Sequence, residues 1–271
     1  MKLSEIYTIA DKLAPKRLSD EYCVSYGAYD NSGLLVEACQ EVKGILFSLD
    51  LTNSAIDEAE KVGANLIITH HPVIYGKISD IKESDEKLLG GKLIRCIQKG
   101  ISVISMHLNL DTANGGIDES MMEGVLRSAG AGMRSNEEVR IMHPVQGGGY
   151  GRVYALPEIP LKELVKGLKN TFSSERVLTY GCEEKAIKKA ASFCGAGADE
   201  YSIAFAKREG ADAVISADFK HHLIAFAKEL GLSVIVMTHY ASENYGFKKY
   251  YEKIRAQVEI PCVYHTDESL L

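Results

Sequence analysis

Leu66-Ile67-Ile68-Thr69-His70-His71-Pro72 is a short apolar run that ends in two histidines and a proline. Residues 65–68 predict a buried strand, because the run is brief and is bounded by a glycine and a proline. Pro72 ends the strand, since proline has no N–H to donate to a sheet. Consecutive side chains of a regular strand point to opposite faces, so His70 and His71 can converge only where the strand has just ended.

Two adjacent imidazoles at the end of a strand indicate a metal site. Neutral imidazole is the commonest protein ligand for first-row metals. The alternative is one core or capping histidine beside one histidine that faces solvent. The dipeptide alone does not separate these two interpretations, and the rest of the chain has to decide between them.

Strands and helices alternate on both sides of this segment, with short links between them. Such alternation predicts a parallel or mostly parallel α/β sheet. After the first helix, the pattern predicts a loop as far as Asp30. The predicted helices lie at about residues 4–15, 55–62, 85–99, 160–168, 199–208, 218–230 and 239–255, and the predicted strands at about 34–36, 44–49, 65–68, 101–105, 152–156, 176–180, 186–193, 213–215, 232–237 and 260–264.

A glycine-rich region, residues 130–151, predicts an irregular link between two domains. We place the boundary within about ten residues of position 130, which gives α/β domains at 1–130 and 131–271. The loop from Gly147 to Gly151 is compatible with a phosphate cradle, but we favour a flexible inter-domain link. The last predicted strand, at 260–264, is compatible with either domain.

Composition restricts the class of protein. A chain of 271 residues has room for two domains of ordinary size. The net charge of −6 argues against a nucleic-acid or anionic-membrane surface. The six cysteines form no CxxC pair and predict reduced thiols. No apolar run approaches the roughly 20 residues needed to span a bilayer, and no signal region is visible, so we expect a soluble cytoplasmic protein.

Potential metal ligands follow three of the predicted strands. The carboxyl ends of parallel strands form the site edge of an α/β sheet. His70 and His71 follow one strand, Asp111 follows the strand at 101–105, and His239 follows the strand at 232–237. Taken singly, Asp111 is also compatible with a turn residue before a Gly-Gly pair.

His239 and Glu243 are four residues apart, where a strand passes into a helix. In a helix this spacing places both side chains on one face. The alternative is a carboxylate that only interacts with the helix dipole. Together, the nitrogen and oxygen ligands of the three strand ends, with one carboxylate able to bridge, favour two divalent cations. Three imidazoles favour zinc, iron or manganese over calcium.

Gly195-Ala196-Gly197 lies between a strand and a helix and resembles part of a dinucleotide fingerprint. The third glycine of that fingerprint falls on Glu200, with Asp199 beside it. These carboxylates would occupy the helix N-terminus that a pyrophosphate needs, so we reject a dinucleotide cofactor.

Several motifs in order resemble one known family over nearly the whole chain. They are DNSGLLV (30–36), ITHHP (68–72), HLNLD (107–111) with a Gly-Gly pair shortly after, GRV (151–153), SADFKHH (216–222) and HYASE (239–243). They are similar to those of the NIF-three-like family, whose members are often named GTP cyclohydrolase 1 type 2 homologs. The chain differs from many members in Tyr29, Ser32 and Ala217.

The resemblance implies two α/β domains that face each other across a dinuclear metal site in the cleft between them. It also implies a ring-shaped homohexamer. His107 and His222 match family histidines near the site and are candidates for proton transfer or for positions behind the ligands. The ligands that the resemblance implies are His70, His71, Asp111, His239 and Glu243.

The family name implies a metal-dependent hydrolase with a small-molecule substrate, a nucleotide. A metal-bound hydroxide would attack an electron-poor carbon, such as C8 of a purine nucleotide, and open the imidazole ring, with His107 or His222 moving protons. The alternative is a metal-binding scaffold or regulatory protein that acts through partner interaction. Turnover of a nucleotide panel by the metal-loaded protein separates the two functions.

Overall fold

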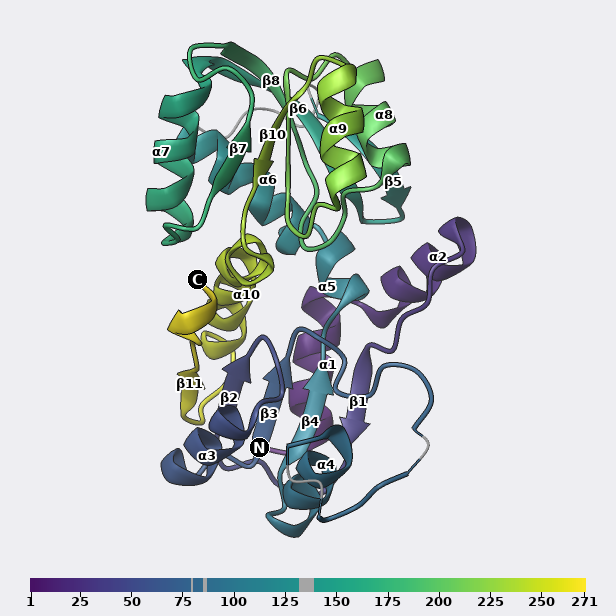
Figure 1. The fold of residues 1–271 in the computed structure, drawn as a ribbon. Coiled ribbons are helices and arrows are strands. Elements are labelled where there is room, and N and C mark those ends of the chain that lie inside the picture. The colour runs from purple at the N-terminus through teal and green to yellow at the C-terminus, as the bar shows by residue number, and fades with distance from the viewer. Residues whose placement is uncertain (79, 85–86, 132–138) are drawn as a thin grey trace. The chain divides into compact units, whose positions relative to one another are not determined.

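The computed structural model describes residues 1–78, 80–84, 87–131 and 139–271 (Figure 1). The chain forms two compact units with a mixed α/β fold. The first unit comprises Met1–Ala113 and Phe247–Thr266, and the second comprises Asn114–Gly246 and Asp267–Leu271. In the ranges described, no helix combines the length and the apolar character needed to cross a bilayer. All six cysteines are free, as predicted.

The first unit contains a five-stranded sheet in the order β1-β4-β3-β2-β11. Its strands are β1 (Gly33–Val36), β2 (Ile45–Ser48), β3 (Leu66–Thr69), β4 (Ser102–Ser105) and β11 (Cys262–Tyr264). Its helices are α1 (Leu3–Leu13), α2 (Lys16–Tyr26), α3 (Asn53–Val62), α4 (Leu89–Gln98) and α5 (Leu108–Thr112). Strands β4, β3, β2 and β11 are parallel, and only β1 is antiparallel to its neighbour, so the mostly parallel sheet is confirmed here.

The central strands of this sheet are short and buried along their whole length. Strands covered on both faces need nearly continuous apolar sequence, which explains the runs that predicted them. The last strand, β11, pairs with β2, so this end of the chain returns to the first unit.

The loop predicted between the first helix and Asp30 is wrong. Residues Lys16–Tyr26 form α2, which ends at Gly27 in a left-handed conformation with φ of 67°. The helix is mostly polar and buries only Leu18, Ser19 and Tyr22. Its apolar periodicity is weak, and it packs against α5, which lies far along the chain. The helix predicted at 85–99 begins later, at Leu89; residues 85–86 lie outside the described residues.

The second unit contains a six-stranded mixed sheet in the order β5-β6-β8-β9-β10-β7. Its strands are β5 (Arg140–Val145), β6 (Gly148–Pro160), β7 (Leu178–Tyr180), β8 (Ala186–Ser192), β9 (Ala213–Ser216) and β10 (Ser233–Val236). Its helices are α6 (Ile117–Ser128), α7 (Leu161–Phe172), α8 (Glu200–Arg208), α9 (His221–Glu229), the start of α10 (His239–Arg255) and the 3-10 turn η2 (Glu268–Leu270). Only β8, β9 and β10 are mutually parallel, so this sheet is more mixed than predicted.

The division of the chain differs from the predicted boundary near residue 130. The first break falls between Ala113 and Asn114, and residues 247–266 return to the first unit. Helix α6 precedes residue 130 but belongs to the second unit, because it packs on α7 and β6. These are long-range contacts, which a glycine-rich stretch does not reveal.

The predicted flexible link at Gly147–Gly151 is instead the turn and first residues of a β-hairpin. Strands β5 and β6 pair in antiparallel fashion, with Val145 opposite Gly148. Gly149 has a φ of 152°, and a Cβ there would lie 2.6 Å from Ile141 Cγ2. Glycine is therefore required by close packing inside a sheet. Residues 132–138 of the predicted link lie outside the described residues.

Candidate metal centre

Three histidines of the first unit lie side by side at the carboxyl edge of its parallel strands. His70 and His71 follow β3, which ends at Thr69, and His107 follows β4. The backbone N–H groups of His70 and His71 both donate to the Leu49 carbonyl, at 3.2 and 3.0 Å. The ring centroids are 4.9 Å apart for His70 and His71, 5.2 Å for His70 and His107, and 6.0 Å for His71 and His107. The predicted convergence at the end of the strand is confirmed.

Asp111 joins this group from α5. Its backbone N–H donates to the His107 carbonyl at 2.8 Å, and the residue is only 4% exposed. Asp111 Oδ1 lies 3.5 Å from His70 Nε2. Ligand atoms of His70, His107 and Asp111 all lie within 4.8 Å of one another. His107, which the resemblance placed behind the ligands, is thus as close to this group as the expected ligands are.

The ring orientation of each of these histidines is determined by a hydrogen bond at Nδ1. The acceptors are carboxylates or a carbonyl, which cannot donate, so each Nδ1 carries the proton and each Nε2 keeps a lone pair. Metal-binding histidines in proteins almost always have this arrangement. The bonds join His70 Nδ1 to the Met106 carbonyl (2.7 Å), His71 Nδ1 to Asp50 Oδ1 (2.8 Å) and His107 Nδ1 to Asp30 Oδ1 (2.7 Å).

Asp30 is a buried carboxylate with several donors. The hydroxyls of Ser19 and Ser32 both donate to Asp30 Oδ2 at 2.5 Å. Burial alone would raise the pKa of Asp30, but the hydrogen bonds from His107, Ser19 and Ser32 outweigh it and lower this pKa to about 2. Burial likewise lowers the pKa of His107, but the bond to Asp30 and the charge of Asp111 leave that pKa raised.

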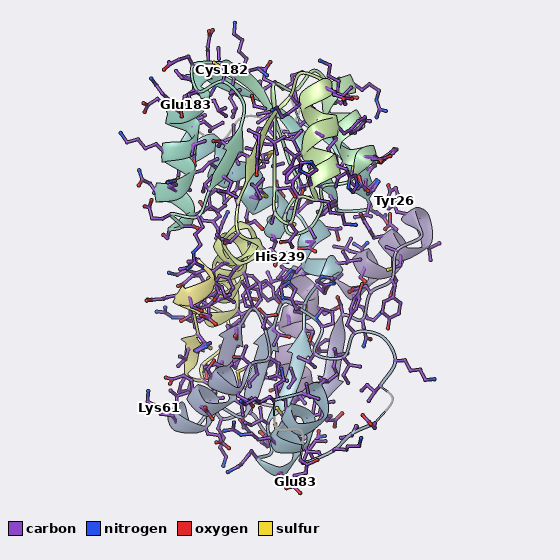
Figure 2. The ribbon with its side chains drawn as sticks, viewed as in Figure 1. Tyr26, Lys61, Glu83, Cys182, Glu183 and His239 are labelled. Atoms are coloured by element: carbon purple, nitrogen blue, oxygen red, sulfur yellow. The ribbon has the colours of Figure 1, made fainter. Side chains whose placement is uncertain are left out.

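In the second unit, His239 and Glu243 share one face at the start of α10, as the spacing predicted (Figure 2 labels His239). His239 Nε2 lies 3.0 Å from Glu243 Oε1. His239 Nδ1 contacts Asp218 Oδ2 at 2.5 Å, which repeats the pattern of the first unit. Glu243 is 3% exposed, so it is not the solvated carboxylate of the dipole interpretation.

Gly195 leaves the space that the Glu243 carboxylate occupies. It follows β8, and a Cβ there would lie 2.3 Å from Glu243 Oε1 and 3.3 Å from His239 Nε2. Its φ of 56° is also one that favours glycine. Its backbone is fixed, because its N–H donates to Ser242 Oγ at 3.1 Å and its carbonyl accepts from the Ala217 N–H at 3.0 Å.

Gly195 is therefore part of the histidine–glutamate site rather than of a nucleotide fingerprint, whereas Gly197 lies against Tyr150 and Phe193. Asp199 caps α8, and its Oδ1 accepts the Ser202 N–H at 2.7 Å. The carboxylate of Asp199 thus occupies the N-terminus of α8, where a dinucleotide would place its pyrophosphate, as the sequence indicated.

Sequence reasoning missed the aspartates behind the histidines. Asp50 and Asp218 each lie two residues after a parallel strand, β2 and β9. Their positions at the carboxyl ends of strands could therefore have predicted that they lie near the site. Asp30 gave no such signal, because it precedes the antiparallel strand β1. His222 lies exposed in the first turn of α9, and its catalytic role stays a prediction.

Replacing Asp218 with asparagine should weaken zinc binding by about 10- to 100-fold. A carboxylate only accepts, whereas an amide can turn either its oxygen or its NH2 group toward His239 Nδ1, so the Nδ1-protonated form of His239 is no longer fixed. Asp212→Asn is the matched control: Asp212 precedes the same strand and accepts two backbone N–H groups, from Lys188 and Lys189. Competition with a chromogenic zinc chelator measures both affinities. Equal affinities in the two variants would contradict the assignment.

The chain is similar to known proteins over nearly its whole length. A family model described as Duf34/NIF3 (NGG1p interacting factor 3) matches residues 1–268. A GTP cyclohydrolase 1 type 2 homolog from Clostridium perfringens is 32% identical over 262 residues, covering 96% of this chain and 93% of that protein. A GTP cyclohydrolase 1 type 2 from Helicobacter pylori is 31% identical over 248 residues, covering 90% and 88%.

A solved structure supports the same relationship. Reduced HcgD from Methanocaldococcus jannaschii matches with a TM-score of 0.79 at 27% identity, over 97% of each chain. The resemblance seen in the HHP and HYASE motifs is thus confirmed by whole-chain comparison. With residues 1–268 matched by one family model, this chain belongs to the Duf34/NIF3 (NGG1p interacting factor 3) family.

Proposed function

We propose that this protein is a metal-dependent hydrolase with two divalent cations. The observation that carries the proposal is that four imidazoles each present Nδ1 to a carboxylate or a carbonyl. A packed core histidine does not need an acceptor that fixes its Nδ1 proton, whereas a metal-binding histidine gains orientation and basicity from one. The proposed ligands are His70, His71, Asp111, His239 and Glu243.

The donor set fits first-row metals. Three imidazoles with two carboxylates favour zinc, iron or manganese over calcium or magnesium. When bound, such a pair of cations supplies an acidified water and neutralises charge that develops on the substrate. Glu243 would be a ligand on which the binding of both cations depends.

The chain's own residues provide proton transfer. His107 holds its Nδ1 proton against Asp30, so Nε2 is the atom that accepts and returns a proton. Asp30, with a pKa of about 2, stays anionic at neutral pH and stabilises the protonated ring. His222 is the second proposed proton-transfer residue.

The proposed reaction is hydrolytic ring opening of a purine nucleotide. Water adds at the electron-poor C8 carbon, and cleavage of the C8–N bond leaves a proton on the ring nitrogen. The names of the relatives from C. perfringens and H. pylori support this substrate class. Incubation of the zinc-, iron- or manganese-loaded protein with a nucleotide panel, followed by mass spectrometry, should reveal ring-opened product. A protein that binds metal and turns over none of the panel would support the scaffold function instead.

Replacing Glu243 with glutamine tests the metal centre directly. The size is kept and the charge is lost, so we expect the fold to survive and the metal content to fall from two ions toward none. His71→Ala removes one ligand and should mainly weaken one ion. Elemental analysis and melting temperature are measured on the same samples.

The control for this substitution is Glu252→Gln, an exposed glutamate farther along α10 that pairs with Arg255. It should keep its full metal content. If Glu243 only interacted with the helix dipole, its replacement would cost about 0.3–1 kcal/mol and leave the metal content unchanged. Full metal content in Glu243→Gln would show that Glu243 is not a ligand on which both cations depend, and it would overturn the two-metal proposal.

We also propose that the chain assembles into a homohexamer, on the basis of the family resemblance. Light scattering coupled to gel filtration should give a mass close to six times 29.7 kDa. A monomer at micromolar concentration would contradict this proposal.

A further inference from the structure

Two tyrosines of the first unit expose their rings beside the histidine group. Tyr29 is 55% exposed and Tyr75 is 58% exposed. Among the described residues, the only other large aromatic side chain with comparable exposure is Tyr201, in α8 of the second unit. Exposed aromatic rings that touch each other form a small apolar surface, which is typical of a binding site.

The two rings are held in a defined arrangement. Their centroids are 5.3 Å apart, with an interplanar angle of 74°, and the Tyr75 hydroxyl donates to the Tyr29 carbonyl at 3.1 Å. The side-chain amide of Asn31 donates to the Ile74 carbonyl at 2.7 Å. The loop before β1 and the loop after β3 are therefore tied together, and the rings are positioned before any ligand arrives.

The pair also adjoins the proposed catalytic histidine. The Tyr75 ring lies edge-on to His107, with centroids 6.1 Å apart and an interplanar angle of 82°. The His107 ring is in turn 6.0 Å from that of His71. A flat molecule that stacks on one of the two tyrosine rings would meet the other ring edge-to-face, and it would lie next to His107.

We propose that Tyr29 and Tyr75 bind the planar heteroaromatic ring of the substrate, which stacks on the face of one tyrosine and contacts the other edge-to-face. The ligand class is a nitrogen heterocycle such as a nucleobase, because every base offers a π-face to an aromatic side chain. The carboxylates of Asp30 and Asp50, beside the histidines, disfavour a phosphate at this position. The inference rests on the proposed function, since the ring belongs to the substrate of the metal centre.

Guanosine, which carries the ring without phosphate, is the probe. Equilibrium dialysis against the full-length protein should give a Kd that rises about 5- to 100-fold in Tyr29→Ala and in Tyr75→Ala. Tyr75→Phe keeps the ring and loses only the hydroxyl bond to the Tyr29 carbonyl, so its Kd should rise less than that of Tyr75→Ala. The control is Tyr201→Ala, since Tyr201 is also exposed and stacks on a histidine, His143, at 5.8 Å. Its Kd should be unchanged.

Ribose 5-phosphate should fail to displace guanosine. Wild-type affinity for guanosine in both alanine variants would overturn the proposal, and so would wild-type protein that binds ribose 5-phosphate but no guanosine. Alanine variants with unchanged guanosine Kd and an altered oligomeric mass would assign the rings to a subunit contact instead.

Metal content and ring-opened product are measured separately on the wild type. If guanosine binding depends on the tyrosines but no product forms, the stacking surface stands and the hydrolase proposal falls. If product forms while the alanine variants bind guanosine normally, the hydrolase stands and the stacking surface falls.

Discussion

Replacing Asp118 with asparagine should lower the free energy of unfolding by about 3–5 kcal/mol, because it leaves a buried guanidinium without its counter-charge. The Asp118 and Arg152 side chains form an ion pair and are 0% and 3% exposed. Asp118 also accepts the backbone N–H groups of Gly151, at 3.0 Å, and Cys194, at 3.2 Å. One carboxylate therefore joins α6 to β6 and to the segment that follows β8.

Urea denaturation of the single and double variants tests this prediction. Arg152→Met added to Asp118→Asn removes the uncompensated charge, so the double variant should be more stable than Asp118→Asn alone. Recovery should be incomplete, because the amide of asparagine accepts less well from the two backbone donors. A cost below about 1 kcal/mol for Asp118→Asn, in the range of an exposed pair, would contradict the assignment of a buried ion pair.

The second large effect is expected at Gly195, where alanine should reduce metal affinity by at least about 100-fold. This loss exceeds the one expected when a residue that hydrogen-bonds to a metal ligand is replaced. The added Cβ would lie 2.3 Å from Glu243 Oε1, so the carboxylate has to move. The backbone cannot retreat easily, because Ser242 and Ala217 hold both polar groups of Gly195.

Gly210→Ala is the matched control for Gly195→Ala. Gly210 has a φ of 79°, and the nearest atom to an added Cβ is Lys189 Nζ at 4.0 Å. Both variants should lose about 1–2 kcal/mol of stability from a left-handed alanine, but only Gly195→Ala should lose metal. Elemental analysis that finds equal metal in both variants would show that the close approach to Glu243 has no role in binding.

The positions of the candidate ligands followed from local rules. The strand at 65–68 ends in His70 and His71 because Pro72 stops it, and the structure places both rings together there. The spacing of His239 and Glu243 needs only helical periodicity. Parallel strands bring their carboxyl ends to one edge, so Asp111 could be predicted to lie near the histidines of its own unit.

The tertiary structure alone decided which groups stand behind those ligands. Asp30 and His107 are 77 residues apart, and Asp218 and His239 are 21 apart, so no periodicity links them. The hairpin at Gly147, the return of β11 to β2 and the burial of Asp118 are long-range pairings of the same kind. Local sequence sets the strand ends and the faces of helices, because φ/ψ preferences and side-chain periodicity act over a few residues. Pairing between distant segments depends on the packing of the whole unit, which alone brings Gly195 against Glu243.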